Sequence, residues 1–505
     1  MQIEPSGDAF AERYARGEAQ VVWTTLVSDL ETPVSAFLKI AGGQPMSFLL
    51  ESVEGGAVRG RYSVIGLKPD LIWRSNAGHA EINRSAQSKS GTFARSKEPP
   101  LVALRALITE SRITLPDGLP PMAAGVFGYL GYDMVRLMEE LPAPNPDPIG
   151  IPDAVLMRPT LVVVFDAVKD SITVVTPVRP EPGLTASAAL ARATERLSAV
   201  VDALDRPLDK SATAFDAGPL AVASTSNTTP AEYQAMVLKA KKYILAGDIF
   251  QVVLSQRFEA PFKLPPFALY RALRRVNPSP YLYFLDYGDF AVAGSSPEIL
   301  VKLKNGVVTI RPIAGTRPRG PTPHEDKALE AELLADPKER AEHLMLLDLG
   351  RNDVGRVVKI GTVSVTDQFF VERYSHVMHI VSNVEGELAQ NRDAIDAMAA
   401  GFPAGTVSGA PKVRAMEIID ELEKEKRGLY AGCVGYFSAA GEMDSCIVLR
   451  TALVKDGKMY VQAGAGIVAD SNPASEQTEC INKATALFRA AEEARRFASA
   501  GKRGQ

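Results

Sequence analysis

The residues best suited to chemistry are two pairs of glutamates, each with a spacing of three residues. Glu339 and Glu342 lie in the stretch KERAEH, and Glu476 and Glu479 lie in the stretch SEQTECINKA. Residues three apart share one face of a helix, where two like charges repel by about 0.2–0.5 kcal/mol. A bound divalent cation would offset this repulsion, and Mg²⁺ prefers hard carboxylate oxygens. The spacing therefore suggests a metal site, provided that the fold brings the two pairs together.

The same spacing also has an ordinary structural explanation. Asp336, Pro337 and Glu339 follow one another as the cap, first and third residues of a helix, so Glu339 could simply complete a capping box. Glu342 would then be a solvated or ion-paired side chain. Because other short glutamate spacings occur in the chain, spacing alone does not decide between the two hypotheses.

Two further helices and a strand are predicted around these residues. Thr229, Pro230 and Glu232 have the order of a helix start, which predicts a helix to about residue 246. The stretch AGAGIVADSNPASEQTECINKATALFRAAEEARR predicts a strand end, a turn and a last helix, on which Lys483 shares a face with the second glutamate pair. Residues 249–258, IFQVVLSQRF, are predicted to form a strand. Its period of two predicts a core face of Phe250, Val252, Leu254 and Phe258 and a more polar face of Gln251, Val253, Ser255 and Arg257.

The chain has one clear compositional break. Residues 205–230, DRPLDKSATAFDAGPLAVASTSNTTP, show no sustained helical or strand period and are interpreted as a linker. This divides the chain into an N-terminal region, 1–204, and a C-terminal region, 231–505. Strands are predicted in the first region near residues 46–52 and 160–168.

The composition is that of a soluble globular protein and argues against several classes of function. The chain has 505 residues, 46% of them hydrophobic, with a net charge of -4 and a pI near 5.9. This length predicts two or three domains, and the charge gives no general reason to bind nucleic acid or a membrane. Cys433, Cys446 and Cys480 lack CxxC spacing and favour neither disulfides nor zinc. We find no signal peptide or membrane span and expect a cytoplasmic protein.

A succession of Gly-rich strand ends and helix starts is more specific. The motifs are AGSSPEIL (293–300), RPIAGTRPRG (311–320), HLMLLDLGRNDVGRV (343–357), RYSHVMHIVSNVEGEL (373–388), PAGTVSGAPKVRAME (403–417) and VQAGAGIVAD (461–470). In this order they resemble the chorismate-utilising enzymes, most closely component I of the anthranilate synthases. The resemblance covers residues 230–490 and, more loosely, 20–180.

The resemblance implies a fold and a division of labour. The fold would be α+β, a sandwich of two antiparallel β-sheets flanked by helices. The region 1–204 would be regulatory and 231–505 would bind chorismate and catalyse its reaction. That reaction would convert chorismate and ammonia to anthranilate and pyruvate, the first committed step of tryptophan biosynthesis. The ammonia would come from a separate glutamine amidotransferase subunit.

The resemblance also assigns binding residues. It places Mg²⁺ among Glu339, Glu342, Glu476 and Glu479. Tyr430 and Arg450 would contact a carboxylate of chorismate, together with the backbone amides of Gly464, Ala465 and Gly466, and Lys483 would assist the metal and carboxylate site. The structural alternatives are a packed core tyrosine, a surface ion pair, an ordinary strand-to-turn transition and a solvated helix lysine.

Four positions are implied in the chemistry itself. Glu298 matches the general acid that protonates the departing hydroxyl, which requires a raised pKa. His379 matches the histidine of pyruvate elimination, with His376 as a neighbouring alternative, and Thr406 matches a residue that contacts the ring. Gln251 stands where relatives that add water carry a lysine, so a base that activates water is missing.

Ala314 and a possible tryptophan site bear on which chorismate-utilising enzyme the chain resembles. Aminodeoxychorismate synthases typically carry a nucleophilic lysine where this chain has Ala314, and alanine cannot form that covalent intermediate. The stretches LLES, RGRYSVIG and NPSPYLYF resemble a tryptophan feedback site. This site would contain Leu50, Glu51, Ser52, Pro280, Tyr281 and Leu282. Two alternatives remain open: aminodeoxychorismate synthase component I and a non-catalytic tryptophan sensor.

Overall fold

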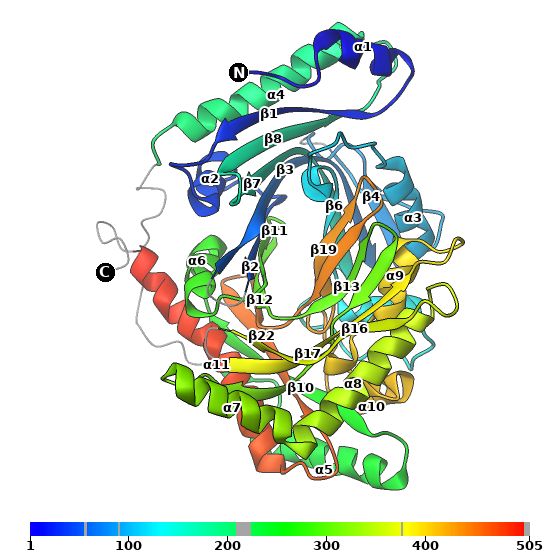
Figure 1. Cartoon of the computed structure of the whole chain (residues 1–505), viewed down its shortest axis with the longest axis vertical. Helices are drawn as coiled ribbons and strands as arrows, with labels where there is room; N and C mark the ends of the chain where they lie inside the picture. The colour runs from blue at the N-terminus through cyan, green and yellow to red at the C-terminus, as the bar shows by residue number, and fades with distance from the viewer. Residues whose placement is uncertain (55–57, 89–90, 209–223, 375–376, 499–505) are drawn as a thin grey trace.

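The fold is built from antiparallel strands that form one hydrogen-bonded network bent into two layers. The computed structural model describes residues 1–54, 58–88, 91–208, 224–374 and 377–498 (Figure 1). All pairings between the strands of this part of the chain are antiparallel. Helices lie outside the layers, as Figure 1 shows. The predicted sandwich of antiparallel sheets flanked by helices is confirmed.

The first layer combines strands from both regions of the chain. It follows the order β9 (Thr225–Ser226), β10 (Gln251–Pro261), β22 (Lys458–Ile467), β21 (Thr451–Lys455), β12 (Phe290–Ser296), β11 (Tyr281–Asp286), β2 (Ser47–Glu54), β3 (Val58–Asn76), β7 (Ala154–Asp166), β8 (Ser171–Val178) and β1 (Gln20–Val27). The short strand β18 (Gly409–Ala410) also pairs with β10, and β4 (His79–Asn83) and β5 (Ala94–Arg95) extend the far end of β3.

The second layer begins where the first ends. Strand β7 pairs with β8 through residues 162–166 and with β6 through residues 154–157, so it belongs to both layers. The order continues through β6 (Gly125–Leu130), β19 (Cys433–Ser438), β20 (Met443–Ile447), β13 (Ile299–Lys304), β14 (Val307–Ile310) and β17 (Val377–Glu387), which also pairs with β15 (Ile313–Pro318) and β16 (Ser364–Arg373).

The two layers face each other across an aromatic core. The rings of Phe48 on β2 and Phe127 on β6 stack at 4.7 Å between centroids, and Tyr129 meets Phe290 edge-on. These side chains belong to one buried cluster that draws on both layers. Burial of such rings stabilises the sandwich, because aromatic pairs add to the area-dependent hydrophobic term.

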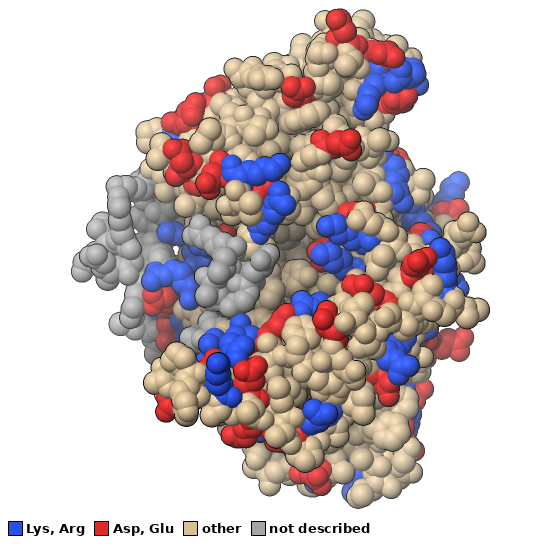
Figure 2. Space-filling view, in the orientation of Figure 1, with Lys and Arg blue, Asp and Glu red and all other residues tan. Residues whose placement is uncertain are grey.

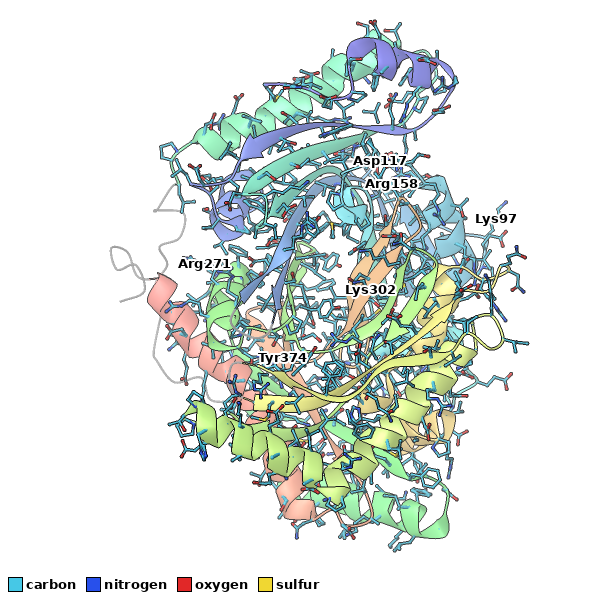
Figure 3. The ribbon with its side chains drawn as sticks, viewed as in Figure 1. Lys97, Asp117, Arg158, Arg271, Lys302 and Tyr374 are labelled. Atoms are coloured by element: carbon cyan, nitrogen blue, oxygen red, sulfur yellow. The ribbon has the colours of Figure 1, made fainter. Side chains whose placement is uncertain are left out.

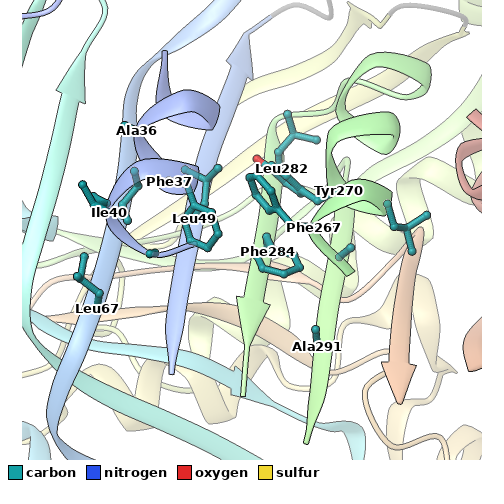
Figure 4. Close-up of a cluster of buried hydrophobic side chains, with 14 of the residues drawn as sticks. Ala36, Phe37, Ile40, Leu49, Leu67, Phe267, Tyr270, Leu282, Phe284 and Ala291 are labelled. Carbon is teal, nitrogen blue, oxygen red and sulfur yellow. The ribbon is translucent and has the colours of Figure 1, made fainter. Parts of the chain in front are cut away.

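The helices cover the outer faces. Those outside the first layer are α1 (Gly7–Ala15), α2 (Pro33–Ile40), α4 (Ala186–Asp205), α6 (Pro266–Val276) and α11 (Pro473–Ala498). Outside the second layer lie α3 (Pro100–Glu110), α8 (Pro337–Gly355) and α9 (Ala394–Gly401), while α7 (Pro323–Ala335) packs on β17 and β15. Figure 4 shows Phe37 of α2 and Phe267 of α6 meeting over the first layer, with ring centroids 4.5 Å apart.

The remaining helices surround one end of the first layer. α5 (Pro230–Ala246) and α10 (Lys412–Leu422) pack with β10 and β22, and short 3₁₀ helices occur at η1 (Pro121–Ala123), η2 (Tyr132–Leu137) and η4 (Gly405–Val407). Among the described residues, none of the helices combines the length and the apolar character needed to cross a membrane.

The predicted local signals are largely confirmed. α5 begins with a capping box formed by Thr229 and Glu232. The prediction for Phe250 is wrong: it precedes β10 and is 71% exposed. Both faces of β10 are buried, because β10 lies within the sheet with α5 and α10 packed against it.

The proposed division at residues 205–230 stays a prediction. Residues 209–223 lie outside the described part of the chain, while residues 225–226 form β9 and pair with β10. Strands of the two regions are hydrogen-bonded to each other at β2–β11 and β6–β19. The two regions therefore share sheets rather than forming separate ones.

Candidate active site

A cavity of about 740 Å³ lies beside α11, where the second predicted glutamate pair is found. Its walls include Arg450, Tyr374, Asn277 and the α11 residues Glu479 and Lys483. Tyr374, labelled in Figure 3, directly follows β16. Two cationic side chains in one small cavity suit a ligand with carboxylate groups.

Arg450 is the less compensated of these cations. It immediately precedes β21, with a left-handed backbone (φ 48°). Burial lowers the pKa of its guanidinium, while the charges of Tyr374 and Glu298 act in the opposite direction. Its guanidinium forms no ion pair within the described residues. A partly buried cation without a close carboxylate partner favours an anionic ligand, because desolvation of an unpaired charge is costly.

Glu298 follows β12 and is almost fully buried. Burial raises its pKa from 4.5 to about 8, although a hydrogen bond from Thr406 and the charge of Arg450 both act to lower it. The hydroxyl of Thr406, on η4, donates to Oε1 of Glu298 at 3.0 Å. Glu298 is therefore protonated near neutral pH, the state that a general acid requires.

His379 lies on β17, opposite Thr316 of β15. Burial lowers its pKa to about 4, so the ring is neutral near pH 7. Nδ1 lies 3.0 Å from the carbonyl oxygen of Gly315, which can only accept, so Nδ1 carries the proton and Nε2 is left as an acceptor. The charges of Arg450 and Lys483 act on the same ring. The alternative, His376, lies outside the described residues.

Close packing explains the glycines of β22. A Cβ on Gly464 would lie 2.7 Å from the carbonyl oxygen of Leu254 and 2.8 Å from the hydroxyl of Tyr430. A Cβ on Gly466 would lie 2.5 Å from the amide nitrogen of Gln251. Glycine is required at position 464, because the Leu254 oxygen belongs to the backbone, whereas at position 466 a Cβ would displace the flexible Gln251 side chain. The structure therefore brings Tyr430 and Gln251 against the predicted carboxylate-binding strand.

Two other residues predicted for the site, Ala465 and Lys483, lie on or beside β22. Ala465 is fully buried and pairs with Leu254 of β10. Lys483 of α11 donates to the carbonyl oxygen of Gly464 at 2.9 Å and forms an ion pair with Glu479 at 2.7 Å. The buried amide of Gln251 has no hydrogen-bond partner for its Oε1 among the described residues. The predicted substrate residues thus converge from β10, β22 and α11.

The four glutamates approach one another but do not form a ligand cluster. α8 begins as predicted, with the Asp336 carboxylate accepting from the amides of Lys338 and Glu339. The capping-box alternative for Glu339 is wrong: no such box forms, and Glu339 instead accepts from Arg317 at 3.0 Å. Within the described part of the chain, no three His, Cys, Asp or Glu side chains are grouped closely enough to hold a metal.

Electrostatics nevertheless connect the two glutamate pairs. Burial raises the pKa of Glu342, and the charges of Glu339 on α8 and Glu479 on α11 raise it further. Burial also raises the pKa of Glu476, with a further contribution from Glu479. This concentration of negative charge, with hard oxygen donors, fits a divalent cation. Such an ion would compete with Arg317 for Glu339 and with Lys483 for Glu479.

The buried ion pair of Glu423 and Arg427, which the sequence did not predict, holds together the elements around the predicted site. Arg427 donates two hydrogen bonds to the Glu423 carboxylate and also donates to the carbonyl oxygens of Val253 and Val407, each at 2.7 Å. Its guanidinium also lies over the ring of Tyr430. One side chain therefore ties together β10, the turn carrying Thr406 and the predicted substrate tyrosine.

The residues predicted to bind tryptophan lie around a second pocket, of about 390 Å³, between the two layers. Its walls include Leu50, Glu51 and Ser52 of β2 and Tyr281 and Leu282 of β11, while Pro280 directly precedes this wall. Figure 2 shows a hollow in this face of the molecule with Lys and Arg on its rim, close to where Figure 3 labels Lys302, another residue of the pocket wall.

The carboxylate of Glu51 is already bound. Arg274 of α6 donates to both of its oxygens, at 2.9 and 3.0 Å, and Tyr270 donates to Oε2. In this structure the side chain therefore offers no free carboxylate to the pocket. Other charged walls remain, including Asp444, whose pKa burial raises to about 6.

The sequence matches a family of known proteins. The family model described as chorismate binding enzyme matches residues 68–489. The chain therefore belongs to the family of chorismate-binding enzymes. This confirms the resemblance inferred from the Gly-rich motifs.

The individual relatives are more specific. Anthranilate synthase component 1 of Cereibacter sphaeroides is 60% identical over 496 residues, covering 98% of each chain, and that of Pseudomonas putida is 48% identical over 92% of this chain and 93% of its own. The crystal structure of anthranilate synthase component I from Streptococcus pneumoniae matches with a TM-score of 0.75 and 39% identity, covering 92% of this chain and 99% of that one. An Escherichia coli isochorismate synthase, MenF, shares the fold at a TM-score of 0.69 but only 20% identity.

Proposed function

We propose that this chain catalyses the amination of chorismate by ammonia to give anthranilate, pyruvate and water. The observation that carries the proposal is a cavity containing Arg450 and Lys483, together with a protonated Glu298 and a neutral His379 whose pKa values are both lowered by the nearby charge of Arg450. The names of the curated relatives support the same reaction.

The side chains suit the two stages of this reaction. Arg450 and the Gly464–Gly466 backbone would hold a carboxylate of chorismate. Protonated Glu298 would donate its proton to the ring hydroxyl, which leaves as water while ammonia adds to the ring. Nε2 of His379 is free to accept the proton lost as pyruvate is eliminated. Neither Gln251 nor Ala314 supplies the amine that the hydrating or covalent alternatives require.

A divalent cation, expected to be Mg²⁺, is the proposed cofactor. Glu339, Glu342, Glu476 and Glu479 would surround it. When bound, it would neutralise carboxylates of the protein and of the substrate. The support is electrostatic, since the Glu342 carboxyl is half-buried beside two other carboxylates.

We further propose that the pocket between the layers binds tryptophan as a feedback inhibitor. It offers apolar walls at Leu50 and Met443 for an indole ring, and it carries both signs of charge, at Lys302 and Asp444, for a zwitterionic amino acid. Titration calorimetry should show binding of tryptophan and much weaker binding of alanine, which lacks the ring. Equal affinity for both amino acids would contradict the proposed role of the apolar walls.

The decisive experiment is anthranilate fluorescence from the purified chain with chorismate, ammonium and Mg²⁺. We expect product without any partner, because ammonium replaces the proposed glutamine amidotransferase subunit. Accumulation of 4-amino-4-deoxychorismate would favour the aminodeoxychorismate alternative. Tryptophan binding without loss of chorismate would favour the sensor.

A further inference from the structure

A third cavity lies far from these residues in the sequence and is made only from the N-terminal region. It has a volume of about 340 Å³ and lies between α4, the end of β8 and the segment following β4. Its charged walls consist of Arg84, Arg179, Arg192, Arg196, Asp70 and Glu181. Four arginines against two carboxylates leave an excess of positive charge.

Ion pairing within the walls does not remove this excess. Asp70 is bound by Arg158, which donates to both of its oxygens at 2.8 and 3.0 Å. Figure 3 labels Arg158, which comes from β7. Glu181 has only a 3.5 Å contact with Arg192, and both of these side chains are more than half exposed. Arg84 is paired with Glu110, just outside the cavity, through hydrogen bonds of 2.8 and 2.9 Å. The excess of positive charge therefore lies on Arg179, Arg192 and Arg196.

Arg179 is the central group of this cavity. Its side chain is only 22% exposed, its closest carboxylate oxygen is on Asp70 at 4.0 Å, and its Nε has no hydrogen-bond partner among the described residues. Burial and the neighbouring charge of Arg158 lower the pKa of its guanidinium to about 10. A buried guanidinium with an unused donor is costly unless an anion approaches it.

The start of α4 adds to the positive charge around the cavity. Leu184 and Ala189 belong to the cavity wall, and α4 begins between them with Thr185 as its cap. The first turn of a helix carries a partial positive charge that favours anions. Arg192 and Arg196 extend from the same helix, one turn apart, so three guanidinium groups and a helix start surround one space.

We propose that this cavity binds a small phosphate monoester, with its phosphoryl group held by Arg179, Arg192 and Arg196. Several guanidinium groups from different elements suit a tetrahedral dianion, whereas one planar carboxylate is satisfied by a single arginine. The volume exceeds what a phosphoryl group fills and reaches the lower end of small-molecule pockets, roughly 300–1,000 Å³. The remainder of the ligand would contact Thr160 and Gln87 on the wall.

The test is titration calorimetry of the full chain in phosphate-free, low-salt buffer. The probes are inorganic phosphate, glycerol 3-phosphate and, as a dicarboxylate, succinate. The variant is the double substitution Arg192→Gln/Arg196→Gln, which changes one exposed and one partly buried side chain and leaves Arg179 in place. The control is Arg351→Gln, since Arg351 is an exposed arginine on α8.

We expect inorganic phosphate and glycerol 3-phosphate each to bind, with the same affinity for the unmodified chain as for the control variant. The double variant should bind glycerol 3-phosphate at least about tenfold more weakly, because charge-assisted hydrogen bonds of this kind contribute roughly that much each. Binding should persist in saturating chorismate, since the active site is elsewhere.

Four results would overturn the proposal. These are no phosphate binding by the unmodified chain, unchanged affinity in the double variant, displacement of phosphate by chorismate, and succinate binding as tightly as glycerol 3-phosphate. The last would leave a general anion site in place of one for a phosphoryl group.

Discussion

Glu298 permits the sharpest test of the proposed chemistry, because its burial affects both stability and catalysis. The folded chain holds its pKa near 8, whereas the ordinary value is 4.5. Between these pH values the unfolded chain is ionised at this position and the folded chain is protonated. The unfolded state therefore binds fewer protons, and stability falls as the pH rises across this window.

The size of the effect follows from the pKa difference. Each unit corresponds to about 1.4 kcal/mol, so the shift of about three and a half units amounts to roughly 5 kcal/mol over the whole window. Between pH 6 and 8 the expected loss is about 2 kcal/mol, because Glu298 is already half ionised in the folded chain at pH 8. Glu298→Gln keeps an oxygen for the Thr406 hydroxyl but cannot ionise, so its unfolding free energy should lack this component.

The assay is urea denaturation at pH 6, 7 and 8, with Glu140→Gln as a control at an exposed glutamate. From pH 6 to pH 8 the unfolding free energy of Glu298→Gln should rise by roughly 2 kcal/mol relative to that of the unmodified chain. Anthranilate formation should decline above about pH 8 as Glu298 ionises. It should be about 10²–10⁴-fold slower in Glu298→Gln.

Two outcomes would refute this reasoning. A constant stability difference between pH 6 and 8 would mean that Glu298 is ionised in the folded chain. Near-normal turnover by Glu298→Gln would mean that another group protonates the leaving hydroxyl. The exposed control separates these outcomes from general effects of losing one negative charge.

Three further predictions concern the metal, the close-packed strand and the buried ion pair. Chelation of the metal should abolish turnover, and added Mg²⁺ should restore it. At limiting Mg²⁺, Glu342→Gln should reduce turnover by about 10–100-fold or more. Normal activity of this variant at limiting Mg²⁺ would remove Glu342 from the site. In urea denaturation Gly464→Ala should cost about 1–3 kcal/mol of stability, and in rate measurements it should raise KM for chorismate. The control Gly355→Ala should do neither, because a Cβ at position 355 meets nothing closer than 3.9 Å. Arg427→Met should cost about 3–5 kcal/mol in urea denaturation by leaving a buried carboxylate unpaired, against less than about 1 kcal/mol for the exposed Arg351→Met.

Local sequence signals predicted the elements well because they act over a few residues. Thr229 with Glu232, and Asp336 with the amides after it, start helices where the cap pattern indicates. The prediction for Phe250 failed because periodicity does not show where a strand begins. The same period was misleading within β10, since a strand covered by helices is buried on both faces.

The ion pair of Glu423 and Arg427 could not be predicted from the sequence. It lies in DELEKEKRGLY, a run of charges that is typical of a solvated helix end. Both side chains are nevertheless buried, because the hydrogen-bond partners of Arg427 come from residues 253 and 407. Contacts between distant segments of this kind leave no periodic trace in the chain.

The resemblance to a family predicted side chains that spacing could not. It assigned Glu298, His379 and Arg450 to one site, and the charge of Arg450 lowers the pKa of both Glu298 and His379 in the structure. It did not predict that Arg317 binds Glu339 or that Arg274 binds Glu51. Motifs identify which residues occur at a site, whereas the ion pairs that a ligand must replace depend on the whole fold.

The sheet also gives a physical reason why a ligand between the layers could influence the chemistry. Tyr281 and Leu282 of the second pocket pair with Ser296 and Ser295 of β12, and Ser296 lies two residues before Glu298. On the opposite wall, β20 ends at residue 447, whose amide donates to the carbonyl oxygen of Glu298 at 3.0 Å.

The two sites have different walls but are linked through neighbouring strands. β20 also leads, within three residues, to Arg450, and Glu298 directly precedes β13, so the proposed proton donor and the proposed carboxylate-binding cation are both adjacent to strands that line the second pocket. A ligand that prefers a slightly wider separation of the layers would move these two groups relative to each other. Because catalysis depends on their geometry, such a ligand need not enter the active site to inhibit it.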